Sequence, residues 1–180
     1  GQSDYLSWKA AKVCLQHQRD FNYLEARHLW EDANVDAGGI RIAGMHYRAL
    51  ILEEDPPAQA KKAVDILAKA GRIIRWHDAM PDSEFLAAIG RLVAPDVQID
   101  PGTPDVRVRH VSKGGIHYYL LFNEGPEELD VHFTLSAKGN RMLLGPMTGE
   151  SNILTANHPV HLSRHAMTIL AVIPQVGWRI

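Results

Sequence analysis

Cysteine is almost missing from this 180-residue chain, which contains only Cys14. A single cysteine excludes a disulfide framework within the chain and any zinc cluster built on several thiolates. It leaves the redox compartment undecided. We therefore expect the fold to depend on a hydrophobic core, for which a hydrophobic content of 46% is sufficient.

An excess of charge of one sign is also lacking, because 19 basic and 21 acidic residues nearly cancel to a formal net charge of -2. The chain has no basic block, so the electrostatic footprint of a nucleic-acid binder is absent. No apolar run approaches the roughly 18 residues that are needed to span a bilayer. We expect neither nucleic acid nor a membrane as a partner.

The N-terminus shows none of the charged, apolar and small-residue order of a signal peptide. It begins with Gly1 in place of Met, which suggests a processed chain from which a signal or an upstream domain was removed. The compartment stays open. It is periplasmic or extracellular if the parent protein is exported, and cytoplasmic otherwise.

The first part of the chain is rich in predicted helix. Apolar residues at helical spacing predict a helix over residues 7–19, and a second is expected over residues 23–30. Pro81-Asp82-Ser83 supplies the cap of a later helix, which Pro95 ends.

Between these helices the pattern predicts a β-α-β unit over residues 47–76. Residues 47–52 form a nearly continuous apolar run, which is typical of a buried central strand of a parallel sheet. Pro56 and Pro57 begin a helix that Gly71 ends, and the next strand follows directly. The crossover between the two strands is expected to be right-handed.

The second part of the chain is rich in predicted strand. After a short edge strand at residues 96–100, Pro101-Gly102-Thr103-Pro104 is the best linker candidate. We therefore predict an α/β lobe over residues 1–100 and an antiparallel β module over residues 105–180.

Local turn signals and one apolar run organise the β module. Hairpin turns are predicted at residues 112–115, 124–126 and 137–140. Residues 161–174 are predicted to form a closing strand pair or one long strand.

The turn that follows residues 47–52 argues against a nucleotide site. Glu53-Glu54-Asp55-Pro56-Pro57 is acidic and poor in donors, whereas a phosphate-binding turn needs glycines and free backbone amides. An amidotransferase nucleophile would be a cysteine on a strained strand-to-helix turn, but Cys14 lies in the first predicted helix. The adjacent carboxylates also cannot flank a glycosidic bond from two sides. We expect no cofactor and no catalytic residue here.

Histidine is abundant, with ten residues, which makes metal binding and acid–base chemistry candidate functions. His158, His161 and His165 would share one face of a helix, but Pro159 and the β-rich sequence around them disfavour a helix, and no metal site is predicted. His77 and Asp78 follow a predicted parallel strand. They are interpreted either as a base with its orienting carboxylate or as a connecting loop.

The run from His117 to Phe122 contains the best aromatic candidate for a sugar platform. Period-two alternation places His117, Tyr119 and Leu121 on one face and Tyr118 on the other, so one of the two sets must be core. The tyrosines are either packed in that core or stacked on a ligand. His77, Asp78, His117 and Tyr119 are the tentative ligand-binding residues.

The order of several short motifs resembles large bacterial glycoside hydrolases of the α-L-rhamnosidase and β-galactosidase-like type. The motifs are Arg107, Arg109-His110, the run Tyr118 to Asn123 and Gly145-Pro146-Met147-Thr148-Gly149. Upstream, Gly38-Gly39, the run Tyr47 to Leu52 and the run Ala70 to Ile74 are similar to the accessory α/β lobe of those enzymes, so that the match spans most of residues 20–173. In those proteins a Trp or Asp often precedes the proline, whereas this chain has Leu144-Gly145. That departure removes the basis for a ligand role of the turn.

The resemblance implies a flavodoxin-like or amidotransferase-like parallel-sheet lobe followed by a β-sandwich. It also implies an accessory role, because the catalytic (β/α)₈ barrel of such enzymes needs more than 180 residues. The implied partners are the barrel of the parent protein, a carbohydrate and a second copy of the chain. Two alternatives stay open, a free-standing enzyme that uses the carboxyl edge of the sheet near Glu53, Asp55, His77 and Asp78, and a stand-alone carbohydrate-binding module.

Overall fold

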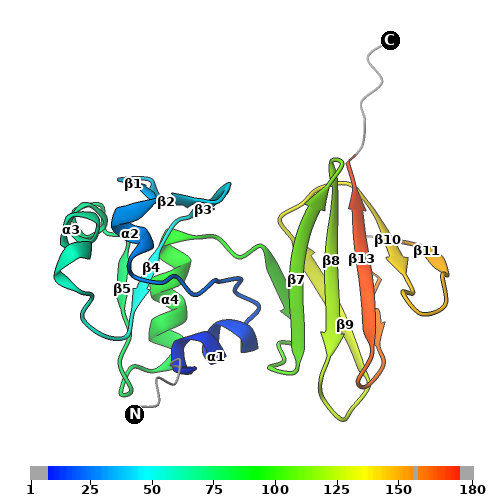
Figure 1. The fold of residues 1–180 in the computed structure, drawn as a ribbon. Helices are drawn as coiled ribbons and strands as arrows, with labels where there is room; N and C mark the ends of the chain where they lie inside the picture. Colours follow the sequence, from blue (N-terminus) through cyan, green and yellow to red (C-terminus); the bar gives the residue numbers. More distant parts are fainter. Residues whose placement is uncertain (1–7, 156–157, 175–180) are drawn as a thin grey trace, which may run out of the picture. The chain divides into compact units, whose positions relative to one another are not determined.

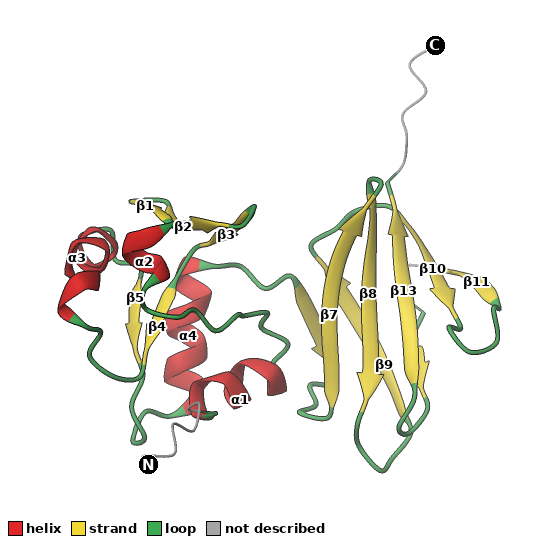
Figure 2. Ribbon diagram, in the orientation of Figure 1, coloured by secondary structure: helices red, strands yellow, loops and turns green. Residues whose placement is uncertain are grey.

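The computed structural model describes residues 8–155 and 158–174, and the chain divides into two compact units. The first unit comprises Gly1–Val13 and Phe21–Ala94, and the second comprises Cys14–Asp20 and Pro95–Ile180. Helices α2, α3 and α4 belong to the first unit, whereas the second is built mainly of strands (Figure 1, Figure 2). The broad prediction of an α/β part followed by a β-rich part is confirmed.

The first unit contains a small antiparallel sheet and a parallel strand pair. The sheet is formed by β1 (Asn34–Asp36), β2 (Gly39–Ile42) and β3 (Met45–Tyr47). The parallel pair is β4 (Leu50–Leu52) and β5 (Ile73–Arg75). The helices are α1 (Lys9–Gln16), which continues into the second unit, α2 (His28–Glu31), α3 (Lys61–Lys69) after the 3-10 turn Ala58–Ala60, and α4 (Asp82–Leu92).

The predicted β-α-β unit exists as β4, α3 and β5. Helix α3 buries Ala63 and Leu67 on its apolar side, against Leu29 and Ile40. Gly71, with φ +66, ends the helix, because its N–H donates to Ala68 O and the following N–H of Arg72 donates to Leu67 O. These two bonds are those of a Schellman motif, in which the left-handed residue is usually glycine.

Residues 47–52 do not form the single buried central strand that was predicted. The chain leaves β3 at Tyr47 and enters β4 at Leu50, and all three residues of β4 are only half-buried. Arg72 explains the break, because its guanidinium donates to Arg48 O at 2.9 Å and so takes a carbonyl that a strand ladder would use. The parallel sheet has two strands among the described residues.

Two predicted helices also differ from the structure. Within residues 23–30 only α2 is helical, because the segment buries Leu29 alone and has no continuous apolar face. Helix α4 follows Pro81 with no side-chain cap, since Asp82 is already its first residue. The described part of the chain has no helix with both the length and the apolar character of a membrane span.

The second unit is an antiparallel β-sandwich. Its larger sheet has the order β11-β10-β13-β8-β7, and its smaller sheet has the order β12-β9-β6. The strands are β6 (Val97–Asp100), β7 (Val106–Lys113), β8 (Ile116–Asn123), β9 (Leu129–Leu135), β10 (Asn140–Leu144), β11 (Ser151–Leu154), β12 (Val160–Leu162) and β13 (Met167–Ile173). The predicted edge strand is β6, and the predicted linker 101–104 connects it to β7 within this unit.

One core lies between the two sheets. The inward side chains alternate along each strand, as Val131, Phe133 and Leu135 of β9 and Tyr119 and Leu121 of β8 do. Leu170 of β13 is fully buried between them. The face predicted for Tyr119 and Leu121 is therefore the core face.

Only one of the three predicted turns joins two strands of one hairpin. Gly114 and Gly115 have φ values of +59° and +80° and connect β7 to β8, with Lys113 opposite Ile116. Residues 124–126 and 137–140 instead carry the chain from one sheet to the other. The closing segment also contains two strands in different sheets, β12 beside β9 and β13 beside β8.

Candidate functional site

The carboxyl edge of the parallel pair is where an open α/β sheet would bind a ligand. In this chain, the first turn of α1 contacts that edge. Lys9 forms an ion pair with Asp78 and lies 5.8 Å from the centre of the Trp76 ring. The backbone N–H of Ala10 donates to Glu53 Oε1 at 3.2 Å. Side chains that follow β4 and β5 thus bind the first turn of α1.

His77 and Asp78 do not form a base–carboxylate pair. Asp78 binds Lys9, whereas His77 is exposed and its carbonyl accepts the N–H of Met80 at 2.8 Å. Asp55, a third carboxylate near this edge, pairs with Arg75 at 2.8 Å. The arrangement is that of a connecting loop, one of the two interpretations of the sequence.

The second unit brings the other two predicted residues together with three that the sequence analysis did not combine. His110 Nδ1 lies 2.8 Å from Asp96 Oδ2, and His110 Nε2 lies 2.9 Å from His117 Nδ1. The hydroxyls of Ser136 and Tyr119 both donate to Asp96 Oδ1, the second at 3.4 Å. We call these five residues the histidine–aspartate array.

The array spans both sheets of the sandwich. His110 is opposite Tyr119 in the β7–β8 register, and both side chains point inward, where their rings stack at 4.3 Å with an interplanar angle of 12°. Asp96 precedes β6 and Ser136 follows β9 in the smaller sheet. Backbone bonding joins these two as well, because Ser136 N–H donates to Asp96 O at 2.8 Å.

The hydrogen bonds leave one nitrogen of His117 at the end of the array. His110 uses Nδ1 toward Asp96 and Nε2 toward His117 Nδ1. The Nε2 of His117 is therefore the end of the array, and chemically it can form one hydrogen bond with a ligand hydroxyl.

Tyr119 belongs to the core rather than to an open platform. Its side chain is fully buried, and burial is the main reason why the pKa of its phenol is raised. The nearby charge of Asp96 acts in the same direction, while a hydrogen bond with Ser136 opposes the shift. A ring that is packed in the core against His110 has no free face to stack on a sugar.

The remaining histidine candidates lie on strands and loops. His161 is an exposed residue of β12 whose Nδ1 lies 3.1 Å from Asp130 Oδ1. His165 has φ +51 in the turn before β13, and His158 precedes β12. Among the described residues no group of three His, Cys, Asp or Glu side chains is arranged to hold a metal ion.

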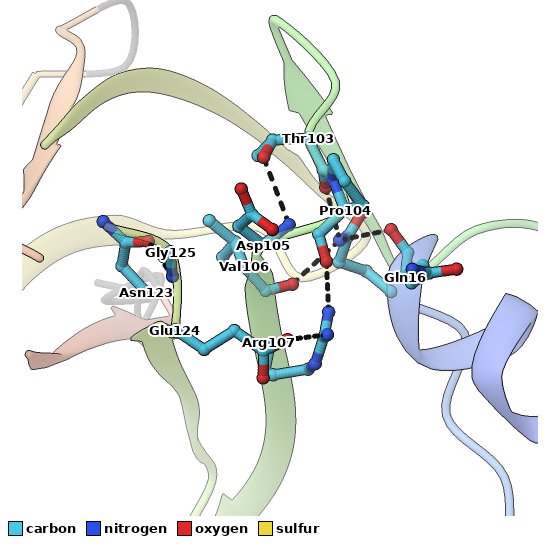
Figure 3. A network of polar contacts seen from close by, with 10 residues as sticks. Gln16, Thr103, Pro104, Asp105, Val106, Arg107, Asn123, Glu124 and Gly125 are labelled. Carbon is cyan, nitrogen blue, oxygen red and sulfur yellow. Dashed lines mark hydrogen bonds and ion pairs between the residues drawn. The ribbon is translucent and has the colours of Figure 1, made fainter. Parts of the chain in front are cut away.

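Two motif residues that carried the family resemblance have structural tasks in the sandwich. Figure 3 shows Arg107 bonded both to the Pro104 carbonyl and to Glu124. Asn123, which is fully buried, donates to Glu127 O at 2.8 Å and to Leu162 O at 3.1 Å and accepts the N–H of Gly125 at 3.0 Å. These bonds fix the point where the chain leaves β8 for the other sheet.

The Gly145 to Gly149 motif is the turn between β10 and β11. Gly149, with φ +72, donates its N–H to Gly145 O at 2.8 Å. The N–H of Glu150 donates to Thr148 Oγ1 at 3.3 Å. A side chain at position 145 would meet that hydroxyl, because a Cβ there would lie 2.4 Å from Thr148 Oγ1.

Comparisons with known proteins identify the fold. No protein-family model and no curated protein matches the chain. A rhamnosidase from Novosphingobium sp. PP1Y matches with a TM-score of 0.63 and 15% identity, over 89% of this chain and 20% of that one. An apo exo-carrageenase GH42 from Bacteroides ovatus matches with a TM-score of 0.54 and 13% identity, over 93% of this chain and 26% of that one.

The fold is that of one part of these two glycoside hydrolases. The resemblance found in the sequence is confirmed at this coarse level, as a likeness of fold. The chain spans about a fifth of the rhamnosidase and about a quarter of the exo-carrageenase.

No sequence pattern indicated Asp96 or Ser136 as members of the array. Asp96 lies 23 residues before Tyr119, and Ser136 lies 40 residues after Asp96. Neither residue belongs to a recognisable motif. A local signal existed only for the alternation along β7 and β8, which puts His110 and His117 on one face once the Gly114–Gly115 turn fixes the register.

Proposed function

We propose that this chain is a non-catalytic accessory portion of a carbohydrate-active enzyme of the glycoside hydrolase class, and that its main role is to brace the catalytic domain. The observation that carries this proposal is the match of 89% of this chain to 20% of a rhamnosidase chain. An α-L-rhamnosidase or β-galactosidase-like parent with a (β/α)₈ barrel, and a flavodoxin-like or amidotransferase-like character of the first unit, remain predictions from the motif resemblance.

The contacts of the acidic residues support a non-catalytic role. Glycosidases need two carboxyl groups on opposite sides of a sugar bond, one of them free to protonate the leaving group. In this chain Glu53 accepts the Ala10 N–H, Asp55 pairs with Arg75 and Asp78 pairs with Lys9. Each of these carboxylates stabilises the first unit, so the same contacts speak against a free-standing enzyme at this edge.

The test is an activity assay of the chain itself on a panel of aryl glycosides. We expect no turnover above that of a heat-unfolded sample. Turnover that disappears in His77→Ala and persists in the matched variant His46→Ala, an exposed histidine of β3, would overturn the accessory role and support the free-standing enzyme.

Weak glycan binding is a second candidate function, and the position of His117 at the end of the array favours it. His110 bonds its Nδ1, and a sugar hydroxyl can pair with its Nε2 either as donor or as acceptor. Titration calorimetry against rhamnose- and galactose-containing glycans at millimolar concentration tests this function. Heat that is lost in His117→Ala but kept in His161→Ala supports the site, and absence of heat with the unchanged chain rejects it.

A further inference from the structure

The larger sheet of the sandwich has an apolar outer face. Directly paired residues of neighbouring antiparallel strands lie on the same face, so the strand register defines this surface row by row. One row consists of Val111, Tyr118, Ala171, Met142 and Ile153. In the next row Leu120, Ile169 and Leu144 are paired across three strands, with Arg109 and Ser151 at the two ends of the row.

Phe122 and Met167 form a third apolar pair at the other end of the same face. Together with the two rows they define what we call the apolar outer face. Large side chains of this surface are open to water: Val111 is 43% exposed, Phe122 39%, Met167 43% and Ile153 83%. An exposed apolar surface that runs over several strands marks an interaction site in a soluble domain.

The smaller sheet provides a control within the same sandwich. The outward residues of β9 are Asp130, His132 and Thr134, and all three are exposed. Their partners on the neighbouring strands are His161, Asp100 and Gln98. This outer face is polar throughout, so an apolar outer face is not a general property of the sandwich.

Two of the charges beside the apolar outer face already have partners. Arg107, Arg109 and Lys113 of β7 alternate onto the same side as Val111, and of these Arg107 pairs with Glu124 and Arg109 pairs with Asp20. A partner therefore need not supply acidic groups for the two arginines. The chemistry of the surface over β8, β13 and β10 suits an apolar contact with little charge.

The size of the surface indicates the kind of partner. Five strands at about 4.8 Å spacing, with about six residues of 3.3 Å each on average, give roughly 500 Å² as an upper limit, because β7 contributes Arg107, Arg109 and Lys113 to this face. A complex between separate molecules usually buries about 800 Å² on each partner. Domains of one chain pack through smaller interfaces, since the connecting chain keeps their effective concentration high.

We infer that a further domain of the same polypeptide packs its own apolar surface on the apolar outer face. The inference rests on the proposed function, and the solved neighbours support it, because this fold makes up 20% and 26% of their chains. The smaller sheet then faces water, as its polar outer face requires. The sandwich is covered on one side only.

Hydroxyl-radical footprinting of the protein encoded by the full native reading frame tests this inference, with the 180-residue chain as the reference. We expect Phe122 and Met167 to be modified at least five-fold more slowly in the full protein than in the chain. His132 on the polar outer face should react equally in both. Met147, which is 92% exposed, reports the radical dose in the chain.

A pair of variants gives a second measurement. Met167→Glu should lower the Tm of the full protein and leave the Tm of the chain nearly unchanged, whereas Thr134→Glu should change neither. Equal modification of Phe122 in both proteins overturns the inference. Protection of Phe122 that is already present in the 180-residue chain also overturns the inference. This holds whether that protection is independent of concentration or increases as a second copy associates.

The outcomes separate the inference from the proposed function. A full protein with glycosidase activity and an unprotected apolar outer face leaves the proposed function standing and removes the inference. Protection of the apolar outer face by a domain without glycosidase activity supports the inference and removes the proposed function. A reading frame that encodes no further domain removes both.

Discussion

The two sheets of the sandwich share a core but meet their surroundings differently. Strand β9 of the smaller sheet alternates strictly between buried apolar and exposed polar residues. Strand β8 of the larger sheet follows the same alternation of burial at its centre, yet Tyr118, Leu120 and Phe122 on its outward side are also apolar. Strands that are apolar on both faces are typical of sheets covered on both sides.

This difference shows that alternation of hydrophobicity reports how many faces of a strand are covered, in addition to which face is inside. β9 is suited to packing on one face only, whereas β8 and β13 are suited to packing on both faces. We therefore expect substitutions on the inner faces of the two sheets to have similar effects on the free energy of unfolding, and substitutions on the outer faces to have different ones. Single substitutions test this expectation.

The largest effect is expected from truncating the inner face of the larger sheet. Leu121→Ala removes a fully buried side chain from the shared core and should lower the free energy of unfolding of the sandwich by about 3 kcal/mol. Leu120→Ala, the adjacent outward residue, should cost about 1 kcal/mol in the chain alone. Urea denaturation followed by circular dichroism measures both, and equal costs would remove the distinction between the faces.

A polar residue on the same inner face should follow in size. Asn123→Ala leaves two backbone carbonyls and one N–H without their partner, at a site that is fully buried. We expect a loss of about 2 to 3 kcal/mol, because unsatisfied buried groups retain their desolvation cost. Asn152→Ala on exposed β11 is the matched control and should be nearly neutral.

A pH effect distinguishes Tyr119 on the inner face of the larger sheet. Its folded-state pKa is raised mainly by burial, so the folded chain binds more protons than the unfolded chain above the ordinary tyrosine pKa of about 10. Stability is therefore complete below that pH and falls as the pH rises. Tyr119→Phe should flatten this alkaline loss in denaturation curves from pH 9 to about pH 11, and an unchanged slope would contradict the assignment.

The smallest effect is expected for charge on the outer face. Arg109 and Asp20 form an ion pair whose side chains are about half exposed. Such pairs contribute less than about 0.5 kcal/mol at moderate salt. Arg109→Ala should therefore change the unfolding midpoint only slightly, and a loss above about 1 kcal/mol would mean that charge matters on this face more than apolar contact does.

Sequence patterns predicted those elements whose signals are local. The helix α3 and its Gly71 end, and the Gly114–Gly115 hairpin, depend on residues that lie next to one another. The alternation in β8 correctly placed Tyr119 and Tyr118 on opposite faces, because period two is a property of the strand itself, but it left open which face is the core.

Sheet membership could not be predicted in the same way. The turns at 124–126 and 137–140 have ordinary hairpin residues, but the chain crosses between sheets at both. Partner choice depends on packing over the whole core, which no turn sequence encodes. For the same reason the sequence could not predict that Asp96 belongs to the array. Nor could it predict that Asp78 pairs with Lys9, which lies 69 positions away.

The position of β13 has a consequence for synthesis. This strand lies between β8 and β10 in the larger sheet, although it follows all the other described strands in sequence. Until the ribosome has released it, β7 with β8 and β10 with β11 remain two separate ribbons, and isolated two-stranded ribbons are barely stable. The sandwich must therefore complete its folding after nearly all of its sequence has emerged, with the gap at its centre exposed to chaperones until then.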